Sequence, residues 1–158
     1  MSIKLKNSEL QRFQESLNKL KDYSWKFNIK VLIILTRIEK CLNDEIDMYN
    51  TLRKDIFDTF SIEAKEDSST LTDDGDPIYK KGDKIVPPDS NAMKEFSERV
   101  IELNNAEITI SLDETIPMHC LEMEYEKKTD TNEVIKHKEP IITDWFLLEK
   151  LSPIITKD

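Results

Sequence analysis

A long stretch without glycine or proline, from about Phe27 to about Phe60, is the feature that most constrains how this chain folds. Apolar and aromatic residues recur in it at every third or fourth position, which is the period of one helix face. The residues on that face are Val31, Leu35, Ile38, Leu42, Ile46, Tyr49, Leu52, Ile56 and Phe60. The pattern predicts a single amphipathic helix of about 34 residues and about 50 Å.

A helix of that length is too long for a chain of 158 residues to cover on all sides. Long amphipathic helices usually pack against a second long helix, in the same chain or in a partner. Self-association is therefore a hypothesis for this chain. The apolar residues are densest at 27–35, so we expect that end to lie deepest in the core.

Three shorter helices are predicted around the long one. Ser8, with Gln11 three residues later, has the pattern of a capping box that starts a helix of about 14 residues. Asp89 or Ser90 is expected to cap a helix over 91–104. A last helix is expected to begin after Thr143. Its expected buried face consists of Trp145, Leu148 and Leu151, with Trp145 closing the core.

Alternating apolar and polar residues predict strands at 3–6, 107–112 and within 119–137. The last of these resembles a hairpin. A second small hairpin is expected where Ile78-Tyr79 and Ile85-Val86 flank a Gly-containing turn. The predicted fold class is α+β, with a long amphipathic helix and flanking helices packed on a small, mainly antiparallel sheet. We expect a single domain over 1–158, with a polar excursion at 61–90.

The charge of the chain favours a protein partner over nucleic acid. The net charge is −9, and the acidic excess lies in residues 61–158. Duplex binding needs clustered cations, which the sequence lacks, so no direct nucleic-acid binding is expected. An acidic surface can instead meet a basic surface on a protein, although it can also serve only to keep the chain in solution.

The small numbers of glycine and cysteine residues further limit the classes of function that are possible. With Gly75 and Gly82 as the only glycines, phosphate-cradling glycine loops are excluded. Cys41 and Cys120 lie far apart and form no disulfide framework, which favours a reducing compartment. The N-terminus lacks an apolar signal core, and the aliphatic run 31–35 is too short to span a membrane. We expect a cytoplasmic protein without a membrane partner.

No residue pattern predicts a metal or cofactor. Asp73, Asp74 and Asp76 surround Gly75, but the alternating ligands and closing Glu of a calcium loop are missing, which favours a solvated turn. The possible zinc ligands are Cys41, His119, Cys120 and His137. Their spacing does not match known zinc sites, and Cys41 is better explained as a small apolar residue near the helix seam.

Catalysis is also not indicated. A nucleophile needs a base and an orienting group, and no such arrangement stands out. Acidic residues on the long helix have basic neighbours and are expected to be its solvated face; they are Glu39, Asp44, Glu45 and Asp47. We expect no enzymatic activity and no cofactor.

Several segments along the chain form a pattern that is shared with other proteins. They are residues 3–10, Glu45-x3-Tyr49-x3-Arg53, Asp73-Asp74-Gly75, Phe96 with Glu102-Leu103, residues 107–110 and Leu151-Ser152-Pro153-Ile154-Ile155. In these segments and in its order of elements, the chain resembles an uncharacterised family of small proteins encoded by tailed bacteriophages and prophages, mainly of low-GC bacteria. The resemblance covers most of the chain and excludes 119–138, which looks like an inserted hairpin. The resemblance implies phage origin, a mixed helix-and-strand fold and a role through binding.

The predicted function is binding to a protein partner. A modulator or inhibitor of a host factor, such as a defence nuclease or effector, is favoured by the acidic second part. A virion assembly factor (chaperone, connector or scaffold) is favoured by the long helix, and a metal-dependent enzyme is a distant alternative. The expected partner-binding residues are Asp73, Asp74, Asp76, Glu122, Glu124 and Asp130.

Overall fold

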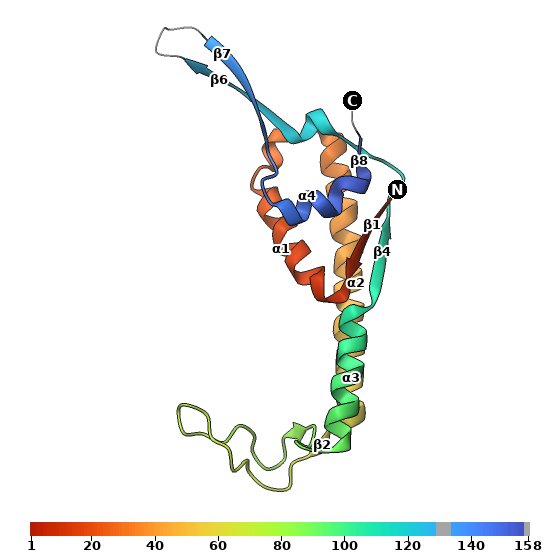
Figure 1. Ribbon diagram of the computed structural model, residues 1–158, viewed down its shortest axis with the longest axis vertical. Coiled ribbons are helices and arrows are strands. Elements are labelled where there is room, and N and C mark those ends of the chain that lie inside the picture. The colour runs from red at the N-terminus through yellow and green to blue at the C-terminus, as the bar shows by residue number, and fades with distance from the viewer. Residues whose placement is uncertain (129–133, 157–158) are drawn as a thin grey trace. The chain divides into compact units, whose positions relative to one another are not determined.

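The computed structural model describes residues 1–128 and 134–156 and has an α+β fold, as predicted (Figure 1). Its longest element is helix α2 (Ile29–Phe60), which confirms the predicted long helix. The chain divides into two compact units. Unit 1 contains Met1–Asp47 and Glu107–Asp158, and unit 2 contains Met48–Ala106. Helix α2 contributes residues to both units, while the single-domain organisation stays a prediction.

Unit 1 holds the main core. The first half of α2 buries Val31, Ile34, Ile38 and Leu42. Helix α1 (Leu10–Lys21) contacts helix α4 (Trp145–Leu151), and α4 also contacts strand β1 (Ser2–Lys6). Further buried side chains come from these elements and include Ile3, Leu5, Leu10, Phe13, Leu17, Leu20, Phe146, Leu147 and Leu151. Burying each such side chain stabilises the fold by about 1.5–3 kcal/mol.

The strands of unit 1 form three separate pairs in place of the one predicted sheet. Strand β1 pairs antiparallel with β4 (Glu107–Ser111), and β5 (Ile116–Pro117) pairs parallel with β8 (Ile155–Thr156). Strands β6 (Glu122–Lys128) and β7 (Val134–Pro140) form the predicted antiparallel hairpin. A 3-10 helix, Met118–Leu121, turns the chain before β6, so the described hairpin does not continue the β1–β4 ladder.

Unit 2 is built from the second half of α2, helix α3 (Asn91–Asn105) and the loop between them. The Phe96 ring packs edge-on against Phe57 and Phe60, and the Tyr49 hydroxyl donates to the Asn104 side chain at 2.8 Å. These contacts align the two helices antiparallel. As predicted, α3 begins after Ser90, whose hydroxyl accepts the Met93 N–H.

The loop at 61–90 is largely exposed but does not form the predicted hairpin. Strand β3 (Lys84–Ile85) pairs with β2 (Ile62–Glu63), and not with Ile78 and Tyr79. The Ile78 N–H donates to the Thr70 carbonyl instead. Gly82 has a φ of 94° in the turn before β3, a conformation that favours glycine. The predicted turn at Gly82 is present, but the residues before and after it pair with other segments of the loop instead of with each other.

Four local predictions in unit 1 are wrong, and the last of them concerns Trp145. Ser8 does not cap the first helix; a 3-10 turn precedes α1, and the Lys6 N–H donates to the Glu9 carboxylate at 2.9 Å. Asp144, not Thr143, caps α4. Cys41 is exposed and does not lie in the helix seam.

Trp145 does not close the core, since 79% of its surface is exposed. The buried face of α4 consists of Phe146, Leu147 and Leu151, while Leu148 is half-buried. Two apolar stripes with helical spacing overlap in this short segment. Which of the two stripes becomes buried depends on the position of α1, which contacts α4 in the folded chain.

Candidate partner-binding surface

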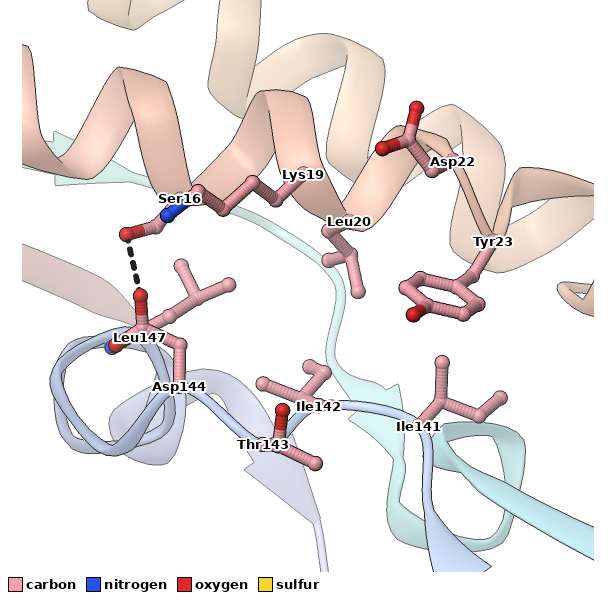
Figure 2. Close-up of a pocket in the computed structure, with 10 residues that line it drawn as sticks. All are labelled: Ser16, Lys19, Leu20, Asp22, Tyr23, Ile141, Ile142, Thr143, Asp144 and Leu147. Carbon is pink, nitrogen blue, oxygen red and sulfur yellow. Dashed lines mark hydrogen bonds between the residues drawn. The ribbon is translucent and has the colours of Figure 1, made fainter.

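The carboxylate of Asp144, the cap of α4, links this helix to α1 at one side of unit 1 (Figure 2). The hydroxyl of Ser16, a buried residue of α1, donates to Asp144 Oδ2 at 2.7 Å. Asp144 Oδ1 accepts the backbone N–H groups of Phe146 and Leu147 at 3.0 and 3.3 Å. The Ser16 hydrogen bond is the largest influence on the pKa of Asp144. With the two backbone donors and Arg12, it holds that pKa below its usual value against the opposing effect of burial.

A cavity of about 250 Å³ lies beside this hydrogen bond. In Figure 2, Leu20 near the end of α1 and Tyr23, which follows that helix, face Ile142 and Ile141 across it. Polar groups at its edge include Lys19, Asp22 and Thr143, so an apolar floor has a polar rim. A small cavity with this mixed lining can accept an inserted side chain.

A second cavity, of about 380 Å³, shares Ile141 with the first. Its other lining residues come from the 3-10 helix Ser24–Lys26 and from the base of the β6–β7 hairpin. They are Trp25, Lys26, Glu122 and Glu124. We call these four residues and Tyr23, five residues in all, the Trp25 surface. It places two aromatic rings and two carboxylates on one side of unit 1.

The Trp25 surface is accessible and charged. Trp25 is 78% exposed and Tyr23 is 45% exposed. Lys138 of β7 forms ion pairs with Glu124 at 3.3 Å and with Glu122 at 3.9 Å. Because all three of these side chains are substantially exposed, their attraction is weak and a partner can compete for the carboxylates.

The residues predicted to bind a partner fall into different parts of the molecule. Glu122 and Glu124 belong to unit 1, at the Trp25 surface. Asp73, Asp74 and Asp76 belong to unit 2, where they are exposed. There the Gly75 N–H donates to the Thr72 carbonyl, which closes the turn. Asp130 lies outside the described residues.

Tyr23, Trp25 and Lys26 were not predicted as site residues. The available signal was the interruption of helical periodicity at Asp22-Tyr23-Ser24-Trp25. Two aromatic residues in a short connection between helices cannot both follow an apolar helix face. At least one of the two rings was therefore expected to be exposed, and in the structure both Tyr23 and Trp25 are exposed.

Unit 2 has a cavity of its own, of about 620 Å³, between the 61–90 loop and the helix pair. Its apolar lining includes Phe57, Ile78, Met93 and Phe96. Serine and threonine hydroxyls at 68–70 supply its polar edge. The lining has few charged groups, Lys84 and Asp89, and so indicates no particular ligand class.

The possible zinc ligands do not form a cluster. In the part of the chain that the structure describes, no three His, Cys, Asp or Glu residues are arranged to hold a metal ion. Cys120 accepts a hydrogen bond from the Asn28 side chain at 2.9 Å, while Cys41 is exposed on α2. Within the same described residues, no helix is both long enough and apolar enough to cross a membrane.

Comparison with known proteins found no matching family model, no matching curated protein and no matching solved structure.

Proposed function

We propose that this chain is a phage-encoded, non-enzymatic protein that binds a host protein in the bacterial cytoplasm and modulates or inhibits it. A defence nuclease or effector is the partner class that we favour. The observation that carries the proposal is the Trp25 surface, where Trp25 and Tyr23 are exposed beside Glu122 and Glu124. Tryptophan and tyrosine are enriched among the residues that dominate binding energy at protein interfaces.

Charge supports the choice of a basic partner. The chain carries a net charge of −9, and Glu122 and Glu124 lie beside the exposed rings. Nucleases bind nucleic acid through basic surfaces, and an acidic protein can occupy such a surface in place of phosphate. Complementary charge also accelerates encounter with the partner.

The test is affinity capture from a host lysate, followed by an activity assay of the captured protein. Trp25→Ala is expected to abolish capture. Trp145→Ala is a matched control, because Trp145 is 79% exposed but is not among the residues lining the cavity beside Trp25. Purified chain should then change the activity of the captured protein. Capture that survives Trp25→Ala unchanged, or a captured protein whose activity does not respond, contradicts the proposal.

A virion assembly factor is the second candidate, and unit 2 supplies the observation that favours it. Met48 and Leu52 on α2 and Ile101 on α3 are 53%, 43% and 59% exposed. Exposed apolar side chains on paired helices suit self-association, which assembly factors commonly use. Light scattering at micromolar concentration is expected to give a mass above 18.6 kDa under this candidate, and the monomer mass would contradict it.

A further inference from the structure

The Trp25 surface already holds a cation from its own chain. The Lys26 ammonium lies 4.9 Å from the centroid of the Trp25 ring and 5.2 Å from that of the Tyr23 ring. A cation within about 6 Å of an aromatic centroid is attracted by the negative face of the ring. Both rings therefore present a face to the same positive charge, while Trp25 keeps most of its surface open to solvent.

The carboxylates nearby favour the same kind of ligand. Glu122 and Glu124 line the cavity with Trp25 and Lys26, and Asp22 lies at the edge of the adjoining cavity. The ion pairs from Lys138 to Glu122 and Glu124 are exposed and long enough, at 3.9 and 3.3 Å, to be exchanged for those of an incoming cation. The aromatic faces and the carboxylates therefore both favour a positively charged ligand.

We propose that the Trp25 surface is the docking site for an arginine-bearing segment of a basic protein partner, and that Lys26 is an internal competitor for that site. The proposal rests on the proposed function and specifies the chemistry of the partner. Arginine fits better than lysine because a planar guanidinium can stack on a ring and donate two parallel hydrogen bonds to a carboxylate. The guanidinium takes the place of the Lys26 ammonium at the rings, and Lys26 moves into solvent.

If Lys26 competes for the site, replacing it should strengthen binding of the arginine-bearing segment. Removing a positive charge from a site that binds a cation strengthens binding in any case, but Lys26→Gln removes charge and also frees the rings. Lys19→Gln is the matched control, because Lys19 is an exposed residue that lines the adjoining cavity, and its loss removes one charge without freeing a ring. A ring contact of this kind changes affinity by about twofold to fivefold. The gain in affinity from Lys26→Gln should exceed that from Lys19→Gln by that factor.

Direct binding can be measured because the chain has two tryptophans, Trp25 and Trp145, both on the surface. Trp145→Phe leaves Trp25 as the only indole, and its fluorescence is titrated with a flexible Gly/Ser peptide that contains arginines. A peptide of the same sequence with citrulline in place of arginine keeps the shape and loses the charge. The expected result is a saturable change with the arginine peptide, and at least a fivefold weaker response with the citrulline peptide.

Two further titrations locate the binding. Glu122→Gln with Glu124→Gln in the Trp145→Phe background should weaken the arginine peptide several-fold. Trp25→Phe, with Trp145 as the remaining reporter, should show no saturable change. An equal response to both peptides, or a saturable response only at Trp145, overturns the proposal.

Failure here is distinguishable from failure of the proposed function. If capture from the host lysate depends on Trp25 but the arginine peptide does not bind, the surface takes a partner of different chemistry and this inference is wrong alone. If nothing is captured and the peptide does not bind, both are wrong. Because the peptide titrations in the Trp145→Phe background need no other substitution, they test the inference even where another variant fails to fold.

Discussion

Helix α2 carries the same apolar period through both units, but the two halves of the helix are buried to very different extents. In unit 1, Val31, Ile34, Ile38 and Leu42 are completely or almost completely buried. In unit 2, Tyr49, Ile56, Phe57 and Phe60 are only half-buried, and Leu52 is exposed. An apolar stripe marks the side of a helix that can be covered; the amount of cover depends on which elements pack there.

The same contrast holds for the units as a whole. Every residue of unit 2 is described, and only Ala64 and Val86 in it are buried. Unit 1 buries a phenylalanine, Phe13, and many leucine and isoleucine side chains completely. Because burial of apolar surface is the main favourable term in folding, most of the stability of the chain should reside in unit 1.

Leu42→Asp tests the core of unit 1 and should have the largest effect. Leu42 is 0% exposed, so the variant buries an unpaired carboxylate and should lose roughly 3 kcal/mol or more of unfolding free energy. Cys41→Asp places the same residue one position earlier, where the side chain is exposed, and should cost under about 1 kcal/mol. Urea denaturation measures both. Similar midpoints for the two variants would show that the stripe of α2 is not core.

A phenylalanine from each unit compares them directly. Phe13→Ala removes a fully buried ring from α1 and should cost about 3–5 kcal/mol. Phe96→Ala removes a half-buried ring that contacts Phe57 and Phe60, and should cost about 1–2 kcal/mol. Denaturation followed by circular dichroism gives both values. An equal loss from the two variants would contradict the contrast between the units.

The Ser16–Asp144 link should make unit 1 sensitive to acid. Because the pKa of Asp144 is lower in the folded chain than its usual 3.8, its ionised form favours folding. This contribution is complete above the usual pKa and is lost as pH falls through the lowered value. Asp144→Ala should cost about 1 kcal/mol near neutral pH, as loss of a helix cap does.

Asp144→Asn is the control for charge, since its amide oxygen can still accept the backbone N–H groups while its amide nitrogen can donate to the Ser16 hydroxyl oxygen. The stability of this variant should fall less steeply than that of the wild type between about pH 5 and pH 2. Urea midpoints across that range measure the difference. Parallel pH profiles would mean that the Asp144 carboxylate is not preferentially ionised in the folded state.

The acidic turn of unit 2 should affect binding more than folding. Replacing Asp73, Asp74 and Asp76 together by Asn should change stability by less than about 0.5 kcal/mol, because all three are exposed. Association with a captured basic partner should be slower than for the wild type at low salt, with a smaller dependence on salt. Stopped-flow mixing at two salt concentrations measures this. Rates that respond neither to salt nor to the substitutions would exclude the turn from the interface.

Features encoded locally were predictable from the sequence. The long helix, the helix after Ser90 and the β6–β7 hairpin all follow from periodicity and a cap. Features that depend on a choice of partner were not predictable. Ile85 pairs with Ile62 rather than with Ile78-Tyr79, and Trp145 stays exposed because α4 packs through Phe146 and Leu147.

The candidate site divides in the same way. Glu122 and Glu124 were predicted from their acidity and their place in a hairpin, and both line the cavity beside Trp25. Tyr23, Trp25 and Lys26 were missed because exposure of an aromatic ring depends on what the neighbouring elements leave uncovered. The surroundings of Trp25 include residues far from it in the sequence, such as Ile141, which lines the same cavity.

Native-state hydrogen exchange tests the contrast between the units most directly, because it reports opening free energies residue by residue within one molecule. The account predicts that amides of α2 between Val31 and Leu42 exchange only through global unfolding. Amides of α3, and of α2 beyond Tyr49, should exchange through a smaller opening at least about 2 kcal/mol lower in free energy. Amides of α3 that exchange as slowly as those around Ile38 would contradict the account.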